Sequence, residues 1–424
     1  MGALKASARS PGAMPTAGWG VRTFTAFGIV GLANILLPYL ILSSLYLIVP
    51  FPQPVVLLIE LLPALAVKLI LPHILHYTPH WLWLLLLASC WVLATIAANA
   101  APPNVIAPIR VLIAVLASAT AAAGEVFFLS QLSRYGKAAL AGWGTGTAVG
   151  GALRAVLPVL VTVHMGVMLR SVTGYAYYLV AALVAADFMV LPSSQSQKRK
   201  SLAIETGFAA EDGAVSEKLG SQKSSLLATE RCSPFSFWER FRRNMLLLSN
   251  KLLRLYIDPL LLVTATQVFV LSGTPRASIA LPGFSSYSMF LSEYGLAFQT
   301  GNVVARSTAL LFRVRRPRLV FAMLLACSLA AILNTTLLLS EDAHVAFSLA
   351  CAVGWCSGFM YMNTFGAAME YLSRNPEEDA EFALGSIGIG QSVGLLIGGL
   401  AGVLFEAQLC GLASRNGRWC STTV

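Results

Sequence analysis

The sequence predicts an all-α polytopic membrane protein with about eleven transmembrane helices. Hydrophobic residues make up 57% of the 424 residues and charged residues only 11%, whereas about a quarter of an ordinary soluble chain is charged. Several stretches long enough to cross a bilayer contain no Asp, Glu, Lys, Arg or His. This composition excludes a soluble enzyme, a disordered chain and a disulfide-rich secreted module.

The predicted spans follow the apolar runs along the chain. Six are expected in the first half, in the runs 23–59, 81–109, 106–130, 138–163 and 167–191, of which the first holds one span and the start of a second. Five are expected in the second half, in the runs 255–273, 287–312, 319–340, 345–369 and 382–405. A cleaved signal peptide has an apolar core of about 7–15 residues, so the longer first run is interpreted as a membrane helix.

Loop charges predict the orientation of the chain. When loops are assigned to alternate sides of the membrane, one side holds 21 Lys and Arg residues and the other holds 5. Because Lys and Arg are enriched in cytosolic loops, we expect the N-terminus in the cytosol and, with an odd number of spans, the C-terminus in a lumen or outside the cell. The net charge of +10 therefore reports orientation and does not indicate a nucleic-acid partner.

A long polar segment divides the chain into two halves. Residues 192–250 are rich in Ser, Lys, Glu and Gly, so a disordered cytosolic linker is expected there. We expect a cytosolic tail at 1–22, a six-helix bundle at 23–191, a five-helix bundle at 251–405 and a luminal tail at 406–424. Two bundles joined by a linker are typical of major-facilitator-like transporters, which bind substrate between their halves near the middle of the membrane.

Charged residues inside the predicted spans are candidates for a transport path. A charge at the centre of a span costs at least about 2.5–3.5 kcal/mol, so it faces a bundle interior or an aqueous route. Glu60 and Lys68 are separated by about 12 Å of rise and about 80° of rotation on one helix, so they do not pair directly. Each also has a structural interpretation, Glu60 as a carboxylate at a helix end and Lys68 as a lysine that extends to the interface.

Glu125 and Arg306 are two further charges in predicted spans. Glu125 follows a run of small residues, 121–124, that lets another helix approach closely. A buried carboxylate with no cation beside it binds a proton readily, so Glu125 is a candidate proton carrier, and the alternative is a structural ion pair. Arg306 suits either a carboxylate or phosphate of a substrate, or a structural partner such as Glu125.

Uncharged polar residues and glycines supply the remaining candidates. Asn363 and Thr364 form a polar pair in an apolar span, where they either line the path or hydrogen-bond between helices. The segment 142–151 is rich in glycine but lacks the Lys-Ser/Thr of a nucleotide-binding loop. Its glycines are therefore assigned to close helix packing or to a gate. The set for this role is Gly124, Gly144, Gly146 and Gly150.

The sequence gives no support for an enzyme. It contains no cluster of metal ligands, no nucleophile–base constellation and no cofactor loop, so neither a metal nor a cofactor is expected. The seven cysteines lack metal-binding spacing. A luminal disulfide between Cys410 and Cys420 stays open at this stage.

Four groups of motifs occur in order along the chain. They are Glu60-Leu61-Leu62-Pro63 with Lys68, Pro72 and Tyr77-Thr78-Pro79; Gly124-Glu125-Val126 through Leu129-Ser130 to Trp143-Gly144-Thr145-Gly146; Gln299, Gly301 and Ala305-Arg306-Ser307; and Tyr361, Asn363-Thr364-Phe365, Glu370 and Glu381-Phe382-Ala383. Together they resemble the battenin family, the lysosomal and vacuolar proteins named for Batten disease. The sequence departs from that family at 267–273, which stands in place of a Glu-Tyr-x-x-Asn-Gln-Gly motif.

The resemblance implies an eleven-helix, major-facilitator-like fold related to equilibrative nucleoside transporters, in the membrane of the vacuole or lysosome. It also implies roles in vacuolar pH homeostasis and in transport of basic amino acids such as arginine. Animal relatives are linked to export of glycerophosphodiesters, which supplies an alternative substrate. The chain is interpreted as a fungal vacuolar member because the luminal loop between its first two helices is very short.

Two functional hypotheses follow. In the first, the chain transports a small molecule by alternating access, with Glu125 responding to protons. The expected path-lining residues are Glu125, Lys68, Glu60, Arg306, Asn363 and Thr364. In the second, the chain is a non-transporting membrane scaffold that acts on trafficking or on the proton pump, with trafficking partners bound by the linker at 192–250.

Overall fold

The computed structural model describes residues 17–46, 52–101, 107–190, 237–275, 287–309, 317–337, 339–340, 342–375 and 378–415. These residues form helices and short connections, and no strand occurs among them. The predicted all-α class is therefore confirmed for the described part of the chain. Long apolar runs account for it, because a chain in lipid must satisfy its backbone hydrogen bonds within each segment.

The first half of the chain forms helices that begin and end near Pro and Gly residues. Pro52 and Pro79 precede the second and third of them, and Gly136 separates the fourth from the fifth with a φ of 76°. The sixth is composite, since 3₁₀ and π turns flank its α-helical part. The helices are α1 Ala17–Tyr46, α2 Gln53–Ile74, α3 His80–Ala100, α4 Ala107–Tyr135, α5 Lys137–Val159 and α6 Ala176–Ala185.

The second half begins with a long composite helix. Its α-helical start, α9 Phe237–Leu247, continues through a π-helical stretch, η6 Leu248–Ile257, into α10 Asp258–Gly273. The helices that follow are α12 Tyr287–Thr308, α13 Pro317–Leu337, α14 Ala343–Arg374 and α15 Ala380–Arg415.

Among the described residues, ten helices are long and apolar enough to cross a membrane. The eighth predicted span, 287–312, corresponds to α12, which has 22 residues but is not among the ten. Its polar residues lower its hydropathy, and it packs between α5 and α14. The polar surface of α12 therefore meets other helices of the protein, which is how a polar helix is accommodated in a membrane bundle.

Three predicted domain boundaries differ from the structure. α1 begins at Ala17 inside the predicted tail 1–22, and α15 continues to Arg415 inside the predicted tail 406–424. α9 begins at Phe237, inside the predicted linker 192–250, because the segment from Phe237 is amphipathic and forms a helix despite its charges. Residues 191–236, which make up most of that linker, lie outside the described residues.

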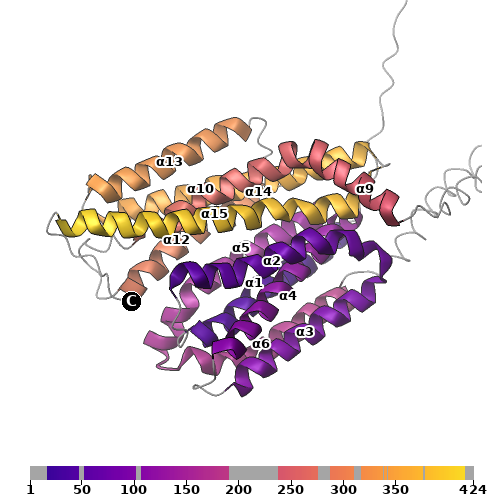
Figure 1. Ribbon diagram of the computed structural model, residues 1–424, viewed down its shortest axis with the longest axis horizontal. Helices are drawn as coiled ribbons and strands as arrows, with labels where there is room; N and C mark the ends of the chain where they lie inside the picture. The colour runs from indigo at the N-terminus through magenta and orange to yellow at the C-terminus, as the bar shows by residue number, and fades with distance from the viewer. Residues whose placement is uncertain are drawn as a thin grey trace, which may run out of the picture.

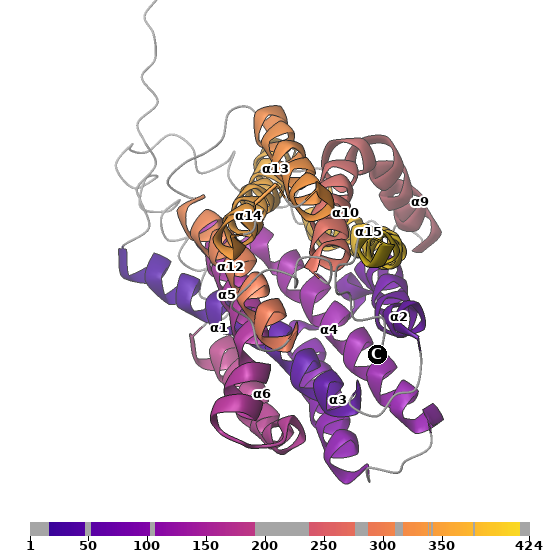
Figure 2. The same cartoon turned by 90° about the vertical axis from the view of Figure 1, so that its left-hand side faces the viewer.

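The two halves pack face to face. In Figure 1 the helices α1–α6 form the lower part of the molecule and α10–α15 the upper part. Figure 2 shows the contacts between them, with α12 beside α5 and α15 beside α2. α15 also packs against α4, and α14 packs against α5. An interface of this kind places α2, α4, α5, α12, α14 and α15 around any route between the halves.

Two ends of the bundle can be distinguished. The helices α4 and α14 finish at one end, where α5 and α15 begin, and we call it the basic end because the loops predicted there hold most of the Lys and Arg residues. The start of α12 and the ends of α5 and α10 lie at the other end, which we call the opposite end.

Candidate transport path

A buried ion pair lies between α2, α4 and α15. Nζ of Lys68 is 2.7 Å from Oε2 of Glu125, and the two side chains are 3% and 18% exposed. Lys68 also donates a hydrogen bond of 3.3 Å to the backbone oxygen of Gly388. The pair itself belongs to the first half of the chain, and the bond to Gly388 connects it to the second half.

Two glycines provide the room for this pair. A Cβ atom at Gly388 would lie 3.0 Å from Oε1 of Glu125 and 3.6 Å from Nζ of Lys68. On the other side of α4, a Cβ atom at Gly124 would overlap the side-chain oxygen of Asn34. Glycine at these two positions lets α4 approach α1 and α15 with the charged side chains between them.

Arg306 occupies the interface between the halves, on α12. Its guanidinium donates a hydrogen bond of 2.7 Å to Oγ1 of Thr147 on α5. Its Cζ atom lies 4.1 Å from the centre of the Tyr361 ring on α14, a cation–π contact. Tyr361 is held in place by Trp143, whose Nε1 donates a hydrogen bond of 3.1 Å to the Tyr361 hydroxyl.

Arg306 has no ion pair with a carboxylate in the described part of the chain. Glu125 is near enough to attract it electrostatically, but the carboxylate of Glu125 is bound to Lys68. The cluster thus holds two cations and one carboxylate, an excess of one positive charge. An arginine in a bundle interior with only a hydroxyl and a ring for partners is suited to bind an anionic group.

A cavity of about 400 Å³ lies between the halves toward the opposite end. It is lined by residues of α1, α5, α10 and α12, among them Tyr39, Arg154, Ser292, Tyr294 and Gln299. The Arg154 guanidinium lies 5.3 Å from the centre of the Tyr39 ring. Gln299 in its lining is two turns from Arg306 on α12, about 10 Å along the helix axis.

Three buried polar atoms, two of them in the cluster and one on α12 a turn before Arg306, lack a hydrogen-bond partner among the described residues. They are Oδ1 of Asn302, Nε of Arg306 and Oε1 of Glu125. Buried polar atoms are normally paired. Their succession from α12 to α4 is therefore consistent with a route for a polar solute.

At the basic end, an ion pair joins the two halves. Arg134 at the end of α4 donates two hydrogen bonds to Oε1 of Glu381 at the start of α15, one of them from Nε at 2.9 Å. The same turn between α14 and α15 also carries Glu378, which pairs with Lys251 at 2.7 Å, and Asp379, which lies 3.7 Å from Arg240. A smaller cavity of about 370 Å³ lies next to this turn. The halves are thus linked by an ion pair at this end, and a cavity of similar volume lies between them toward each end.

The structure brings together some predicted residues and not others. Lys68, Glu125 and Arg306 lie around one centre, and Gly144 lies beside it, since a Cβ atom there would overlap the sulfur of Met362 and approach Arg306. Gly146 and Gly150 pack against α1, where a Cβ atom at Gly146 would overlap the Gly28 backbone oxygen. Their geometry fits the predicted packing role.

Glu60 stands apart from this centre. Its backbone oxygen accepts a hydrogen bond from Ser118, and in the described part of the chain its carboxylate has no ion pair. Asn363 and Thr364 bond back to their own helix, to the backbone oxygens of Phe359 and Met360. These hydrogen bonds therefore do not connect Glu60, Asn363 or Thr364 to the cluster of Lys68, Glu125 and Arg306.

The sequence did not reveal two features of the cluster. An ion pair was one of the two interpretations of Glu125, but its partner, Lys68 on another helix, was not predicted, because pairs between helices leave no spacing signal in one sequence. Thr147 and Trp143 were assigned only to a packing segment, although they hold Arg306 and Tyr361. Cys410 is disulfide-bonded, whereas Cys420 lies outside the described residues.

The fold is that of a multi-pass membrane protein of the major-facilitator type. The fucose:proton symporter FucP of E. coli superimposes with a TM-score of 0.53 at 13% identity, covering 94% of this chain and 98% of that one. A D-xylose-proton symporter gives a TM-score of 0.53 at 11% identity, covering 93% and 97%. At these identities the likeness shows the fold alone.

The family follows from the sequence itself. The model of the CLN3 protein family matches residues 25–412, so the chain belongs to that family, the battenin family. Protein btn1 of Aspergillus fumigatus is 29% identical over 428 aligned residues, which cover 94% of this chain and 90% of the relative. Family and fold resemble those of transporters.

Proposed function

We propose that the protein transports a small solute across the vacuolar membrane by alternating access. Three features support this proposal: two helical halves with a polar route between them, charged groups placed on that route, and a fold shared with symporters. A change of packing between the halves would expose the central cluster first to one end and then to the other. The N-terminus and the basic end are assigned to the cytosol by their Lys and Arg content.

Arg306 is the observation that carries the proposal. It lies at the interface of the halves, it is oriented by Thr147 and Tyr361, and it has no carboxylate partner among the described residues. A substrate with a carboxylate or a phosphate would supply that partner. Such binding gains the energy of a charge-assisted hydrogen bond in a site largely shielded from water.

The charge balance distinguishes two substrate classes. A glycerophosphodiester with one negative charge neutralises the excess positive charge of Lys68, Glu125 and Arg306. Arginine offers a carboxylate to Arg306 but brings two cationic groups, one of which would need Glu125 to leave Lys68. The geometry therefore favours an anionic phosphodiester, with arginine as the competing substrate.

Glu125 is our candidate for the coupling group. Protonation of Glu125 would remove its attraction for Lys68 and weaken the connection through Gly388 to the second half. Exchange of a solute for protons at this pair would make vacuolar pH depend on transport. The scaffold hypothesis depends on the linker, most of which lies outside the described residues.

Purified protein in liposomes tests the function directly. Uptake of radiolabelled glycerophosphoglycerol and of arginine would be compared with and without an imposed pH gradient. We expect saturable uptake of the phosphodiester that depends on the gradient in the wild type and loses that dependence in E125Q. Absence of uptake of both solutes, with folded protein in the vesicles, would leave the scaffold as the better hypothesis.

A further inference from the structure

The composite helix α9–η6 has a feature that the transport path does not use. Between Phe237 and Ile257 it carries five Lys or Arg residues and one acidic residue, Glu239. The helix that includes it, Trp238–Gly273, has 36 residues, about 50 Å at 1.5 Å per residue, whereas the hydrocarbon core of a bilayer is about 30 Å thick. Its first part therefore lies at or beyond the membrane surface.

α9 contacts the first half through an aromatic pair and the second half through an ion pair. The Phe241 ring lies 4.8 Å from the ring of His73 on α2, and His73 in turn lies 4.8 Å from Phe382 on α15. Arg240 is 3.7 Å from Asp379 in the turn before α15. Because α9 is anchored in this way, the side chains on its other faces are held at the basic end in a defined arrangement.

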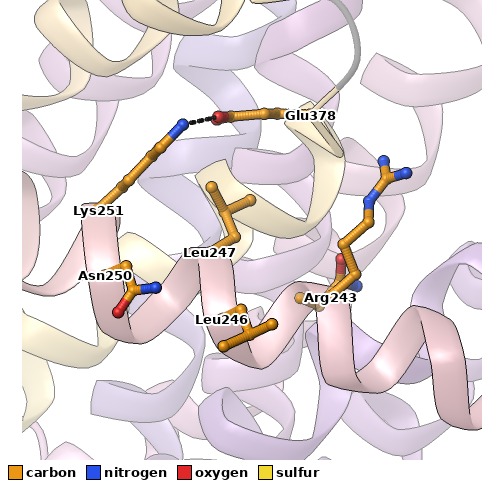
Figure 3. Close-up of a pocket in the computed structure, with 7 residues that line it drawn as sticks. Arg243, Leu246, Leu247, Asn250, Lys251 and Glu378 are labelled. Carbon is orange, nitrogen blue, oxygen red and sulfur yellow. Dashed lines mark hydrogen bonds and ion pairs between the residues drawn. The ribbon is translucent and has the colours of Figure 1, made fainter.

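A cavity of about 400 Å³ opens where α9 passes into the π-helical stretch η6. Arg243 and Lys251 rise on either side of Leu247, and Glu378 lies across from them (Figure 3). Asn244 and Asn250 supply amide groups to its wall. The volume falls within the range of about 300–1,000 Å³ that is typical of small-molecule sites.

The cavity is lined by two cations, Arg243 and Lys251, and by one carboxylate, Glu378, which leaves an excess of one positive charge. Lys251 is 51% exposed and bonds to Glu378 at 2.7 Å through one of its three donors. Glu378 has a second donor, since its Oε1 also accepts a hydrogen bond of 2.8 Å from the Tyr371 hydroxyl. Lys251 can therefore turn a further N–H toward a phosphate beside Arg243, while the Glu378 carboxylate keeps Tyr371 as a donor.

The surroundings of the cavity are suited to lipid. Trp238 at the start of α9 is 72% exposed, and Leu246, which lines the cavity, is 52% exposed. Leu255, about two turns further along the helix, is 57% exposed. Exposed Trp and Leu side chains beside a basic face are typical of helices that lie in the headgroup region. A free phosphate would gain nothing from these apolar neighbours, whereas a phospholipid would contact them with its acyl chains.

We propose that the cavity formed by Arg243, Asn244, Asn250 and Lys251 binds the phosphate headgroup of an anionic phospholipid of the surrounding membrane. Arg243 and Lys251 bind the phosphate oxygens, and the amide groups bind the glycerol or headgroup hydroxyls. The acyl chains lie along Leu246 and Leu255. Clusters of Lys and Arg at the cytosolic end of a transmembrane helix attract anionic lipids in the same way.

Binding of a short-chain lipid to the full-length protein in neutral detergent tests this site. The probe is fluorescent dioctanoyl phosphatidic acid, with dioctanoyl phosphatidylcholine and inorganic phosphate as competitors. We expect that R243Q/K251Q binds the probe at least about tenfold more weakly than the wild type, because two charge-assisted hydrogen bonds are lost. The matched control R242Q/R254Q removes two cations from the same segment outside the cavity, and we expect its affinity to stay within twofold of the wild type.

Three results would overturn the proposal. Equal losses in the two double variants would mean that the basic segment attracts anions without a defined site. Unchanged binding by R243Q/K251Q would place the lipid elsewhere. Competition by inorganic phosphate as strong as that by unlabelled phosphatidic acid would identify a free-phosphate site.

A single variant keeps the test valid if the double variant fails to fold. R243Q leaves the pair between Lys251 and Glu378 intact, and its melting temperature in detergent is measured beside its affinity so that only folded protein is compared. We expect R243Q to weaken probe binding at least threefold, and no change in its affinity would contradict the proposal.

Discussion

The molecule buries two cations near its centre and stabilises them in different ways. Lys68 has a full counter-charge at 2.7 Å in Glu125 and a backbone oxygen at 3.3 Å. Arg306 has a hydroxyl and an aromatic ring, and no carboxylate among the described residues. The charge of Lys68 is balanced by that of Glu125, whereas the positive charge of Arg306 is not balanced by a carboxylate among the described residues and is left for a ligand. We therefore propose that Lys68 stabilises the fold and that Arg306 recognises the solute.

The largest expected effect comes from breaking the complete pair. K68M leaves Glu125 as an uncompensated charge, and removal of one partner of a buried pair costs about 3–5 kcal/mol. We expect the free energy of unfolding in detergent, measured with a chemical denaturant, to fall by that amount at pH 7.5.

The double variant K68M/E125M is the control for that loss. It removes both charges together, so most of the stability should return. If the double variant is as unstable as K68M, the pair is not the source of the effect.

The second prediction concerns Arg306. R306Q is expected to reduce solute uptake at least about 100-fold, since a charge-assisted hydrogen bond to the solute is lost, while the melting temperature changes by only a few degrees. R306K keeps the charge but not the planar guanidinium on Tyr361, so an intermediate rate is expected. A collapse of stability in R306Q comparable to that of K68M would show that both cations are structural.

A third prediction tests the space around the pair. G388A places a Cβ atom 3.0 Å from Oε1 of Glu125, and we expect a loss of about 1–3 kcal/mol in the free energy of unfolding from overpacking. G366A is the matched control in α14, because no atom lies within 4 Å of the added Cβ. A helix gains up to about 1 kcal/mol when alanine replaces glycine, so G366A should be neutral or stabilising.

The smallest effect on stability is expected at the basic end. R134Q breaks the pair with Glu381, whose side chains are 38% and 26% exposed, so we expect a loss below about 1 kcal/mol. The proposed conformational equilibrium should nevertheless shift, and a cysteine placed at Ser133 should react faster with a thiol reagent supplied from the basic end. The charge swap R134E/E381R should restore the wild-type rate of reaction. If it does not, this ion pair does not control access to the interface from the basic end.

The sequence predicted the class of fold because lipid imposes a simple rule. Apolar runs of sufficient length become helices, and these runs are visible without knowledge of tertiary contacts. α9 is an exception to this rule, because its charged residues predict a polar linker although the segment forms a helix. That helix is stabilised by contacts with His73 and Asp379. The local sequence pattern does not predict these contacts, because the contacting residues are far apart in the sequence.

The candidate site was predictable only in part, for a related reason. Lys68, Glu125 and Arg306 could be predicted as candidates because they lie in apolar runs, where a charge is costly. Which of them pair depends on how α2, α4 and α12 meet, and residues 57 positions apart, such as Lys68 and Glu125, leave no periodic signal. The roles of Thr147 and Trp143 required the same knowledge of helix packing.

The central claim is that Arg306 binds the anionic solute, while the pair of Lys68 and Glu125 stabilises the fold and couples transport to protons without binding the solute itself. It is tested most directly by calorimetric titration of glycerophosphoglycerol into the wild type, R306Q and K68M/E125M in neutral detergent. We predict that R306Q weakens binding at least about 30-fold and that K68M/E125M stays within threefold of the wild type. Wild-type affinity in R306Q together with a large loss in K68M/E125M would contradict this assignment.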